Sequence, residues 1–372
     1  MANPYHYGTP VTGEQFAGRE RELRALQSRM RDGINVVVIS PRRYGKTSLI
    51  RRAADDITRS GGAVVSVNLL RCRDMPTLAA QLLTQTYRAK GGAWHRLRQA
   101  VPEFLKRFRL TPTVTFDGEH PRFTLSPSVT VTDVDTVISD VYAVLGELSA
   151  KRAAVLALDE FQAAVDLGPH LPGLFKALAD EHPSVSLVLA GSKRHMMQRL
   201  VTGADAPLFG MAEQLALDVV PSETMVEFVV SRATSGGKRM SPEVAARIVE
   251  LAGPIPNDIQ HLAYESFDVA GRTITADDVD TGLRFAVEHE ASMHADRFES
   301  LSPGQRRVVA ELAVSPTDQP LAAQFVHAVQ LANASSVRRA LDALITDDLV
   351  INRGGTYRVA SPFLAAWLRE TS

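Results

Sequence analysis

The segment VVVISPRRYGKTSLI, residues 36–50, decides the prediction of the fold. Its first residues form an apolar β-branched run that predicts a buried strand, and the apolar spacing after Thr47 predicts an amphipathic helix. Between them, Gly45, Lys46 and Thr47 match the end of the phosphate-binding pattern G-x-x-x-x-G-K-[ST], and Ser40 replaces its first glycine. Because a strand and a helix flank the match and the Lys-Thr pair is intact, we expect a working phosphate-binding loop.

The residue types in this loop predict particular contacts with a nucleotide. Backbone N–H groups would cradle phosphate oxygens, Lys46 would reach the β- and γ-phosphates, and the Thr47 hydroxyl would ligate Mg²⁺. We expect the whole loop to bind the nucleotide, with these residues: Ser40, Pro41, Arg42, Arg43, Tyr44, Gly45, Lys46, Thr47 and Ser48.

Two later strands are expected to complete the site. The apolar run 153–158 ends in Asp159 and Glu160, and beside a phosphate loop the first would hold Mg²⁺ through water while the second polarises an attacking water. Taken alone, the pair would also fit a solvated acidic turn. The run 185–190 is followed by Ser192, for which we predict a γ-phosphate sensor, with helix capping as the alternative. Lys46, Glu160 and Ser192 are thus the expected catalytic residues.

The composition is that of an ordinary globular protein. The chain has 372 residues, of which 45% are hydrophobic and 22% charged, and its net charge of -1 gives no global attraction to nucleic acid or a membrane. A single cysteine, Cys72, allows no disulfide within the chain and favours a reducing compartment. The first eight residues do not resemble a signal peptide, and no apolar run approaches the roughly 20 residues needed to span a bilayer. We therefore expect a soluble cytoplasmic protein.

Three domains are expected from the order of the patterns. Strand and helix patterns alternate from residue 34 to about 192, which predicts an α/β domain with a mostly parallel sheet. Only helical patterns follow from 221 to about 290, and residues 301–372 read as three helices and a hairpin, the order of a winged helix. The expected domains are the phosphate-loop α/β domain at 1–220, a helical lid at 221–295 and a winged-helix domain at 296–372.

Two longer motifs carry a family resemblance. Residues 16–23 read F-x-G-R-E-x-E-L before the first strand, and residues 41–49 read P-R-R-x-G-K-T-S-L. With them the chain resembles the archaeal ATPase group of AAA-like P-loop proteins, relatives of origin-recognition and STAND ATPases. The resemblance covers nearly the whole chain and admits Ser40 as a variation. It implies ATP and Mg²⁺ as cofactors, and it places Phe16 and Ala17 against the adenine base.

Departures from the family pattern bear on hydrolysis. Relatives often have arginine just after a Phe-Gly pair, where this chain has Met211, and the lid motif offers Asn257 and Gln260 but no arginine. Arg194 and Arg199 are the alternative candidates for an arginine that reaches a neighbouring subunit, although each also fits an ordinary surface position. We therefore expect ATP binding with slow hydrolysis, by a monomer or a weak oligomer.

An insertion at residues 88–132 interrupts the α/β pattern. Its first part, 88–109, carries seven basic residues against one acidic residue, with aromatic residues between them. This stretch could face nucleic acid or an acidic partner, or it could be a solvated helix face. The later part, around residues 114–125, predicts a β-hairpin.

The expected winged helix leaves several functions open. Arg338 and Arg339 lie on its third helix, where a DNA reader would lie, but the charges after Leu301 nearly cancel, which disfavours nonspecific DNA binding. The leading hypothesis is an ATPase that acts as a nucleotide-driven switch, with lid and winged helix responding to the nucleotide, and with an unidentified protein partner. The alternatives are an ATP-dependent DNA-binding regulator or loader, and a protein-docking module with ATP as a structural ligand.

One segment comes close to a zinc motif. Residues 289–294 read HEASMH, but the motif H-E-x-x-H spaces its histidines four apart, on one helical face, whereas these are five apart. The segment therefore predicts no metal site.

Overall fold

The computed structural model describes residues 2–11, 13–89, 110–117, 120–127 and 134–371. These residues form two compact units. The sheet unit consists of Arg19–Arg42 and Lys46–Asp218, and the helical unit consists of Met1–Gly18, Arg43–Gly45 and Val219–Ser372. The basic stretch of the expected insertion lies outside the described residues from position 90 to 109.

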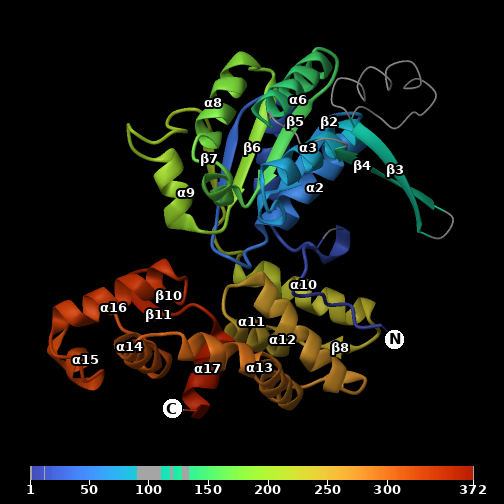
Figure 1. Cartoon of the computed structure of the whole chain (residues 1–372). Coiled ribbons are helices and arrows are strands. Elements are labelled where there is room, and N and C mark those ends of the chain that lie inside the picture. Colours follow the sequence, from blue (N-terminus) through green and yellow to red (C-terminus); the bar gives the residue numbers. More distant parts are fainter. Residues whose placement is uncertain (1, 12, 90–109, 118–119, 128–133, 372) are drawn as a thin grey trace. The chain divides into compact units, whose positions relative to one another are not determined.

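A five-stranded parallel sheet forms the centre of the sheet unit, in the order β2-β5-β6-β1-β7 (Figure 1). Its strands are β1 (Val36–Ile39), β2 (Ala63–Asn68), β5 (Ala154–Asp159), β6 (Val185–Gly191) and β7 (Glu213–Ala216). The sheet confirms the predicted α/β fold. The sequence patterns did not predict β7, because this edge strand has only four residues and none of them is buried.

Helices cover the sheet on both faces. They are α1 (Glu20–Asp32), α2 (Lys46–Arg59), α3 (Met75–Ala89), α6 (Val134–Ser149), α7 (Ala164–Leu167), α8 (Leu171–Glu181) and α9 (Arg194–Val201), with 3₁₀ turns η2 (Leu69–Arg71) and η3 (Phe161–Ala163). Helix α1 packs against α2, and α6 packs against α3 and α8. Alternate strand residues such as Val65, Leu156 and Leu187 share one buried cluster with α3, α6 and α8, as the two-residue period of a strand requires.

The predicted hairpin of the insertion is confirmed. Strands β3 (Leu110–Asp117) and β4 (His120–Pro127) pair in antiparallel register, with Val114 opposite Phe123. This pair is a separate two-stranded sheet and adds no strand to the central sheet.

The first part of the helical unit is built from four helices. They are α10 (Ser222–Ser235), α11 (Pro242–Ala252), α12 (Pro256–Val269) and α13 (Ala276–Glu299), preceded near the N-terminus by η1 (Gly13–Gln15). Ser241 caps α11, because its side chain accepts a hydrogen bond from the Val244 N–H. The expectation of helices alone was wrong in one detail, because β8 (Arg239–Met240) and β9 (Thr273–Ile274) pair in parallel. Two-residue strands are too short to leave a sequence pattern.

The last part of the unit has the expected order of a winged helix. Its elements are α14 (Pro303–Val314), α15 (Ala323–Ala328), α16 (Ala334–Thr346), β10 (Val350–Arg353), β11 (Thr356–Val359) and α17 (Pro362–Thr371). Gly354 and Gly355 connect the hairpin with φ of 59° and 87°, a backbone region that favours glycine. Helix α13 runs past residue 295, where the sequence suggested a boundary. Among the described residues, none of the helices has both the length and the apolar character needed to cross a membrane.

Candidate functional site

The candidate site lies where β1, β5 and β6 end. Strand β6 pairs with β1 on one side and β5 on the other, and the register aligns Ile39 with Gly191 and Leu158 with Leu189. The carboxyl ends of the three strands therefore lie at one edge of the sheet. This edge is where open parallel sheets bind ligands.

The loop after β1 has the backbone of an anion cradle. Gly45 has a φ of +83°, and a Cβ built on it meets no atom within 4 Å, so the space in front of this backbone is open. Helix α2 begins at Lys46, and its first N–H groups lack partners within the helix. Ser40 is 1% exposed, and its hydroxyl donates to the Pro41 carbonyl at 3.2 Å. The serine thus fits the loop.

A buried cation stands beside this cradle. The Lys46 side chain is only 5% exposed, and its Nζ lies 3.8 Å from Glu160 Oε1, too far for a hydrogen bond. Burial lowers the pKa of Lys46, although the charges of Glu160 and Asp159 oppose this effect. A buried ammonium group with such a loose partner can bind an anion.

Thr47 and Asp159 form the closest link between the loop and β5. The Thr47 hydroxyl donates to Asp159 Oδ2 at 2.8 Å, and the Asn68 amide donates to the same oxygen at 3.3 Å. The Glu160 N–H donates to Asp159 Oδ1 at 3.0 Å. A hydroxyl and a carboxylate side by side are oxygen ligands of the kind that Mg²⁺ prefers. Sequence reasoning missed Asn68, although it ends the apolar strand β2 with a polar residue.

Glu160 is held by donors from two elements. The Ser192 hydroxyl donates to Glu160 Oε2 at 2.7 Å, and the Gln162 amide donates to the same oxygen. Burial opposes ionisation of Glu160, but the Gln162 hydrogen bond, the Lys46 charge and the Ser192 hydrogen bond together lower its pKa. Glu160 is therefore a fixed carboxylate. Sequence reasoning missed Gln162, because its hydrogen bond to Glu160 depends on the turn η3 that follows Glu160.

Close packing behind these donors requires a glycine. A Cβ on Gly191 would lie 2.2 Å from Met197 Cγ and 2.7 Å from Gln162 Oε1. The side chain of Ser192, the next residue, is buried. Helix α9 has Lys193 at its N-cap position, so Ser192 does not cap this helix. The structure instead brings Ser192 together with Glu160.

The Arg43 side chain pairs with two carboxylates of the helical unit, the unit to which loop residues 43–45 belong. Its φ is +67°, and its Nη1 lies 3.3 Å from Oδ1 of the fully buried Asp258. Its Nη2 lies 3.8 Å from Glu290 Oε1. Burial raises the pKa of Asp258, although the Arg43 charge and the Asn257 hydrogen bond oppose the rise. Sequence reasoning did not pair Arg43 with these carboxylates.

The remaining residues predicted to bind the nucleotide differ in their burial. Phe16 and Ala17 are half-buried and belong to the helical unit, where Ala17 packs against the core. Of the other loop residues, Tyr44 and Ser48 are buried, Pro41 is half-buried and Arg42 is exposed.

The residues at or near the positions of a catalytic arginine in relatives lie in different surroundings. Asn257 Oδ1 accepts from the Gly8 N–H at 2.9 Å, and Gln260 Oε1 accepts from the His6 N–H at 3.4 Å, so both hold the N-terminal segment. Arg199 is exposed on α9, and the side chain of Arg194 lies outside the described residues. Met211 packs against the core of the sheet unit.

A parallel sheet with a phosphate loop after β1 and an acidic pair at the end of β5 defines the class of P-loop nucleoside triphosphatases. A family model described as an ATPase domain predominantly from Archaea matches residues 16–262, and the chain belongs to this family. A winged helix domain model matches residues 293–370. The comparisons confirm the family resemblance and the predicted order of fold elements.

Solved structures share this fold at low sequence identity. The Walker-type ATPase paby2304 of Pyrococcus abyssi is 18% identical, with a TM-score of 0.70, over 98% of this chain and 99% of that one. The ORC2 protein of Aeropyrum pernix, in ADPNP–ADP complexes, is 14% identical, with a TM-score of 0.57, over 95% of this chain and 93% of that one. No curated protein sequence matches the chain.

Replacing Ser192 by alanine should raise the pKa of the Glu160 carboxyl group, because the variant removes a donor to the ionised form. NMR titration of labelled glutamate carboxyl groups measures this pKa. Ser66→Ala, an exposed serine on β2, is the control and should leave it unchanged. An unaltered Glu160 pKa in Ser192→Ala would contradict the assigned contact.

The same shift has a consequence for stability. The folded-state pKa of Glu160 is below its ordinary value, so ionised Glu160 stabilises the folded chain at neutral pH. This contribution is lost as the pH falls through the folded-state pKa, and in Ser192→Ala the loss should begin at a higher pH.

Proposed function

We propose that this chain binds ATP with Mg²⁺, hydrolyses it slowly, and acts as a nucleotide-driven switch. The single observation that carries the proposal is the hydrogen bond of 2.8 Å between Thr47 and Asp159. It joins the hydroxyl of the phosphate loop to the carboxylate of the neighbouring motif, the two groups that hold Mg²⁺ in P-loop proteins. Membership of an ATPase-domain family supports the same nucleotide.

Each side chain of the site has a role that fits its environment. ATP, when bound, supplies the phosphoanhydride bond and the negative charge that this site would receive. The Lys46 ammonium group binds phosphate oxygens, for which it is suited by its burial and its loose pairing with Glu160. Thr47 and Asp159 hold the cation. Glu160 uses Oε2 for its donors Ser192 and Gln162, which leads us to assign Oε1 to the attacking water.

The proposed switch concerns the helical lid and the winged helix. Arg43 belongs to the phosphate loop, and its guanidinium group pairs with Asp258 on α12 and with Glu290 on α13. A phosphate group would compete with these carboxylates for the same guanidinium group. Nucleotide binding would therefore change the pairing of a buried and a half-buried carboxylate in the lid, and we infer that this is how the lid senses ATP. We propose slow turnover because Met211 stands where relatives often have an arginine.

Lys46→Ala should weaken ATP binding by about 10- to 150-fold, the equivalent of one lost charged hydrogen bond of roughly 1.5–3 kcal/mol. Equilibrium titration with ATP in excess Mg²⁺ measures the change. Lys151→Ala, an exposed lysine of the same unit, is the matched control and should bind as the wild type does. Wild-type affinity in Lys46→Ala would refute the role of this residue.

Glu160→Gln should retain ATP binding but lower the turnover number by roughly 10²- to 10⁴-fold, the range of a lost general base. Steady-state phosphate release measures turnover, and ATP titration measures binding. Glu181→Gln, at the exposed end of α8, serves as the control. Normal turnover in Glu160→Gln would exclude Glu160 as the residue that orients water.

DNA binding through the winged helix is a second candidate function. Arg338 and Arg339 are exposed on α16, within the residues matched by the winged helix model. If these arginines contact phosphates, Arg338→Glu/Arg339→Glu should reduce the slope of log affinity against log salt by about 2. Fluorescence anisotropy with duplex DNA measures the slope, and Arg272→Glu/Arg284→Glu is the exposed control pair. Equal slopes for the two double variants would remove this candidate.

A further inference from the structure

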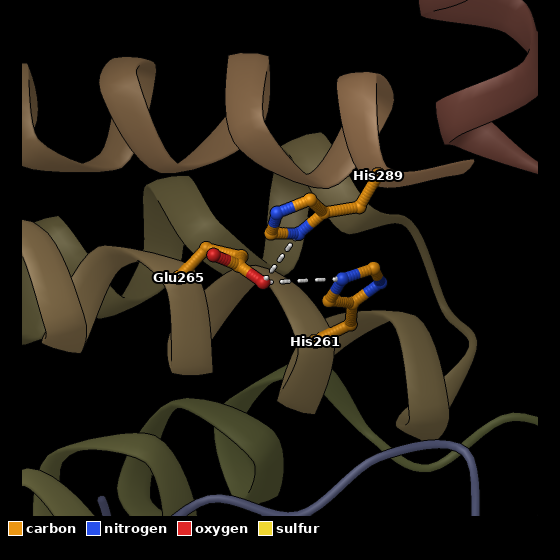
Figure 2. Close-up of side chains that lie close together, drawn as sticks. All are labelled: His261, Glu265 and His289. Atoms are coloured by element: carbon orange, nitrogen blue, oxygen red, sulfur yellow. Dashed lines mark hydrogen bonds and ion pairs between the residues drawn. The ribbon is translucent and has the colours of Figure 1, made fainter. Parts of the chain in front are cut away.

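A cluster of imidazole and carboxylate groups, two of its three members buried, lies within the helical unit and contains none of the residues proposed to hold Mg²⁺. His261 and Glu265 are one turn apart on α12, and His289 faces them from α13 (Figure 2). Glu265 Oε1 lies 3.2 Å from His289 Nδ1 and 3.5 Å from His261 Nε2. One ligand atom from each residue lies within 4.8 Å of the other two. The two helices therefore direct three ligand groups to one point.

His261 gives independent reason to expect a ligand. Its side chain is 2% exposed, and neither ring nitrogen makes a hydrogen bond. A buried polar group without a hydrogen bond is destabilising, so such groups are rare unless a ligand satisfies them. The nearest acceptors are Glu265 Oε1 at 3.5 Å and Glu290 Oε1 at 3.6 Å.

We propose that His261, Glu265 and His289 bind a divalent transition-metal ion, and zinc in particular, as a bridge between α12 and α13. Two imidazole nitrogens and one carboxylate oxygen form a donor set typical of zinc, whereas Mg²⁺ and Ca²⁺ prefer oxygen ligands alone. Three protein ligands leave a fourth position to water. This site goes beyond the proposed ATPase function and does not depend on it.

The distances suit a tetrahedral ion. Bonds of about 2.0–2.1 Å at tetrahedral angles separate two ligand atoms by about 3.3 Å. The distances from Glu265 to the two histidines, 3.2 and 3.5 Å, are close to this value. The ligand atoms of His261 and His289 lie within 4.8 Å of each other. This separation can shorten by rotation of the His289 side chain, because that side chain is 61% exposed. The two ligands on α12 are already fixed by burial.

Neighbouring groups would hold the ligands in place. Glu290 lies next to Nδ1 of His261, the nitrogen that the metal would not use, and a carboxylate in this position orients a metal-binding histidine. The Tyr7 ring stacks on the His261 ring with 3.9 Å between centroids, and its hydroxyl donates to Glu265 Oε1 at 3.4 Å. The N-terminal segment thus positions both ligands from α12.

The comparison of residues 289–294 with the zinc motif H-E-x-x-H assumed that His289 and His294 would bind the same ion. In the structure His294 pairs with Glu290 instead, at 3.5 Å, and His289 faces the other helix. The rejected spacing therefore says nothing about a site whose ligands come from two helices.

The test is a zinc titration of the untagged full chain after chelator treatment, with excess Mg²⁺ present to saturate oxygen-only sites. We expect the wild type to bind about one equivalent of zinc and to gain thermal stability from it. His289→Ala is the main variant, because an exposed side chain can be removed without unfolding the chain. It should lose at least about tenfold in zinc affinity, since even the loss of an outer partner typically costs 10–100-fold.

Two further measurements make the result decisive. His195→Ala, an exposed histidine on α9, is the matched control and should bind zinc as the wild type does. Glu290→Gln, which keeps the ligands but changes their neighbour, should weaken binding without abolishing it. Absence of zinc binding by the wild type, or a loss of less than about tenfold in His289→Ala, would overturn the proposal.

Discussion

Parallel pairing of β6 with both β1 and β5 is the constraint on which the candidate site depends. Because these strands end in register, the residue that follows each one projects into the same space. The phosphate loop comes from a segment more than a hundred residues before the acidic pair and Ser192, yet hydrogen bonds join the loop to the pair and the pair to Ser192. No local segment could position them in this way.

The buried charges of the site are partly compensated before any ligand is considered. A buried ammonium group and a half-buried carboxylate would each be costly alone, and Lys46 and Glu160 reduce that cost for each other. The distance between them stays loose, while tight hydrogen bonds go instead from Thr47 to Asp159 and from Ser192 to Glu160. Hydrogen bonds therefore fix the two carboxylates, whereas the Lys46 ammonium group can exchange Glu160 for a phosphate group.

The sequence predicted those parts of the site whose signal lies within one segment. The loop around Lys46 and the strand ending in Asp159 and Glu160 each combine an apolar run with the polar groups that follow it. The sequence did not predict Asn68, because its hydrogen bond to Asp159 follows from the order of the strands. It did not predict Gln162, because its hydrogen bond to Glu160 follows from the path of η3. Strand β7 escaped because a short exposed edge strand has no apolar alternation.

The histidine cluster illustrates the same limit in the helical unit. His261 and Glu265 are spaced for one helical face, but the third group, His289, comes from the following helix. A search for spacing within one segment tests the pair His289 and His294, which do not converge. Packing between α12 and α13 decides which groups meet, and this information is not local in the sequence.

The central claim is that the edge formed by β1, β5 and β6 binds Mg²⁺ and ATP. A crystal structure of the chain with Mg²⁺ and a non-hydrolysable ATP analogue tests it most directly. We predict the triphosphate in the loop against Lys46, with the cation between Thr47 and Asp159. An analogue bound at another surface, or a cation held by other residues while this edge binds neither, would contradict the account.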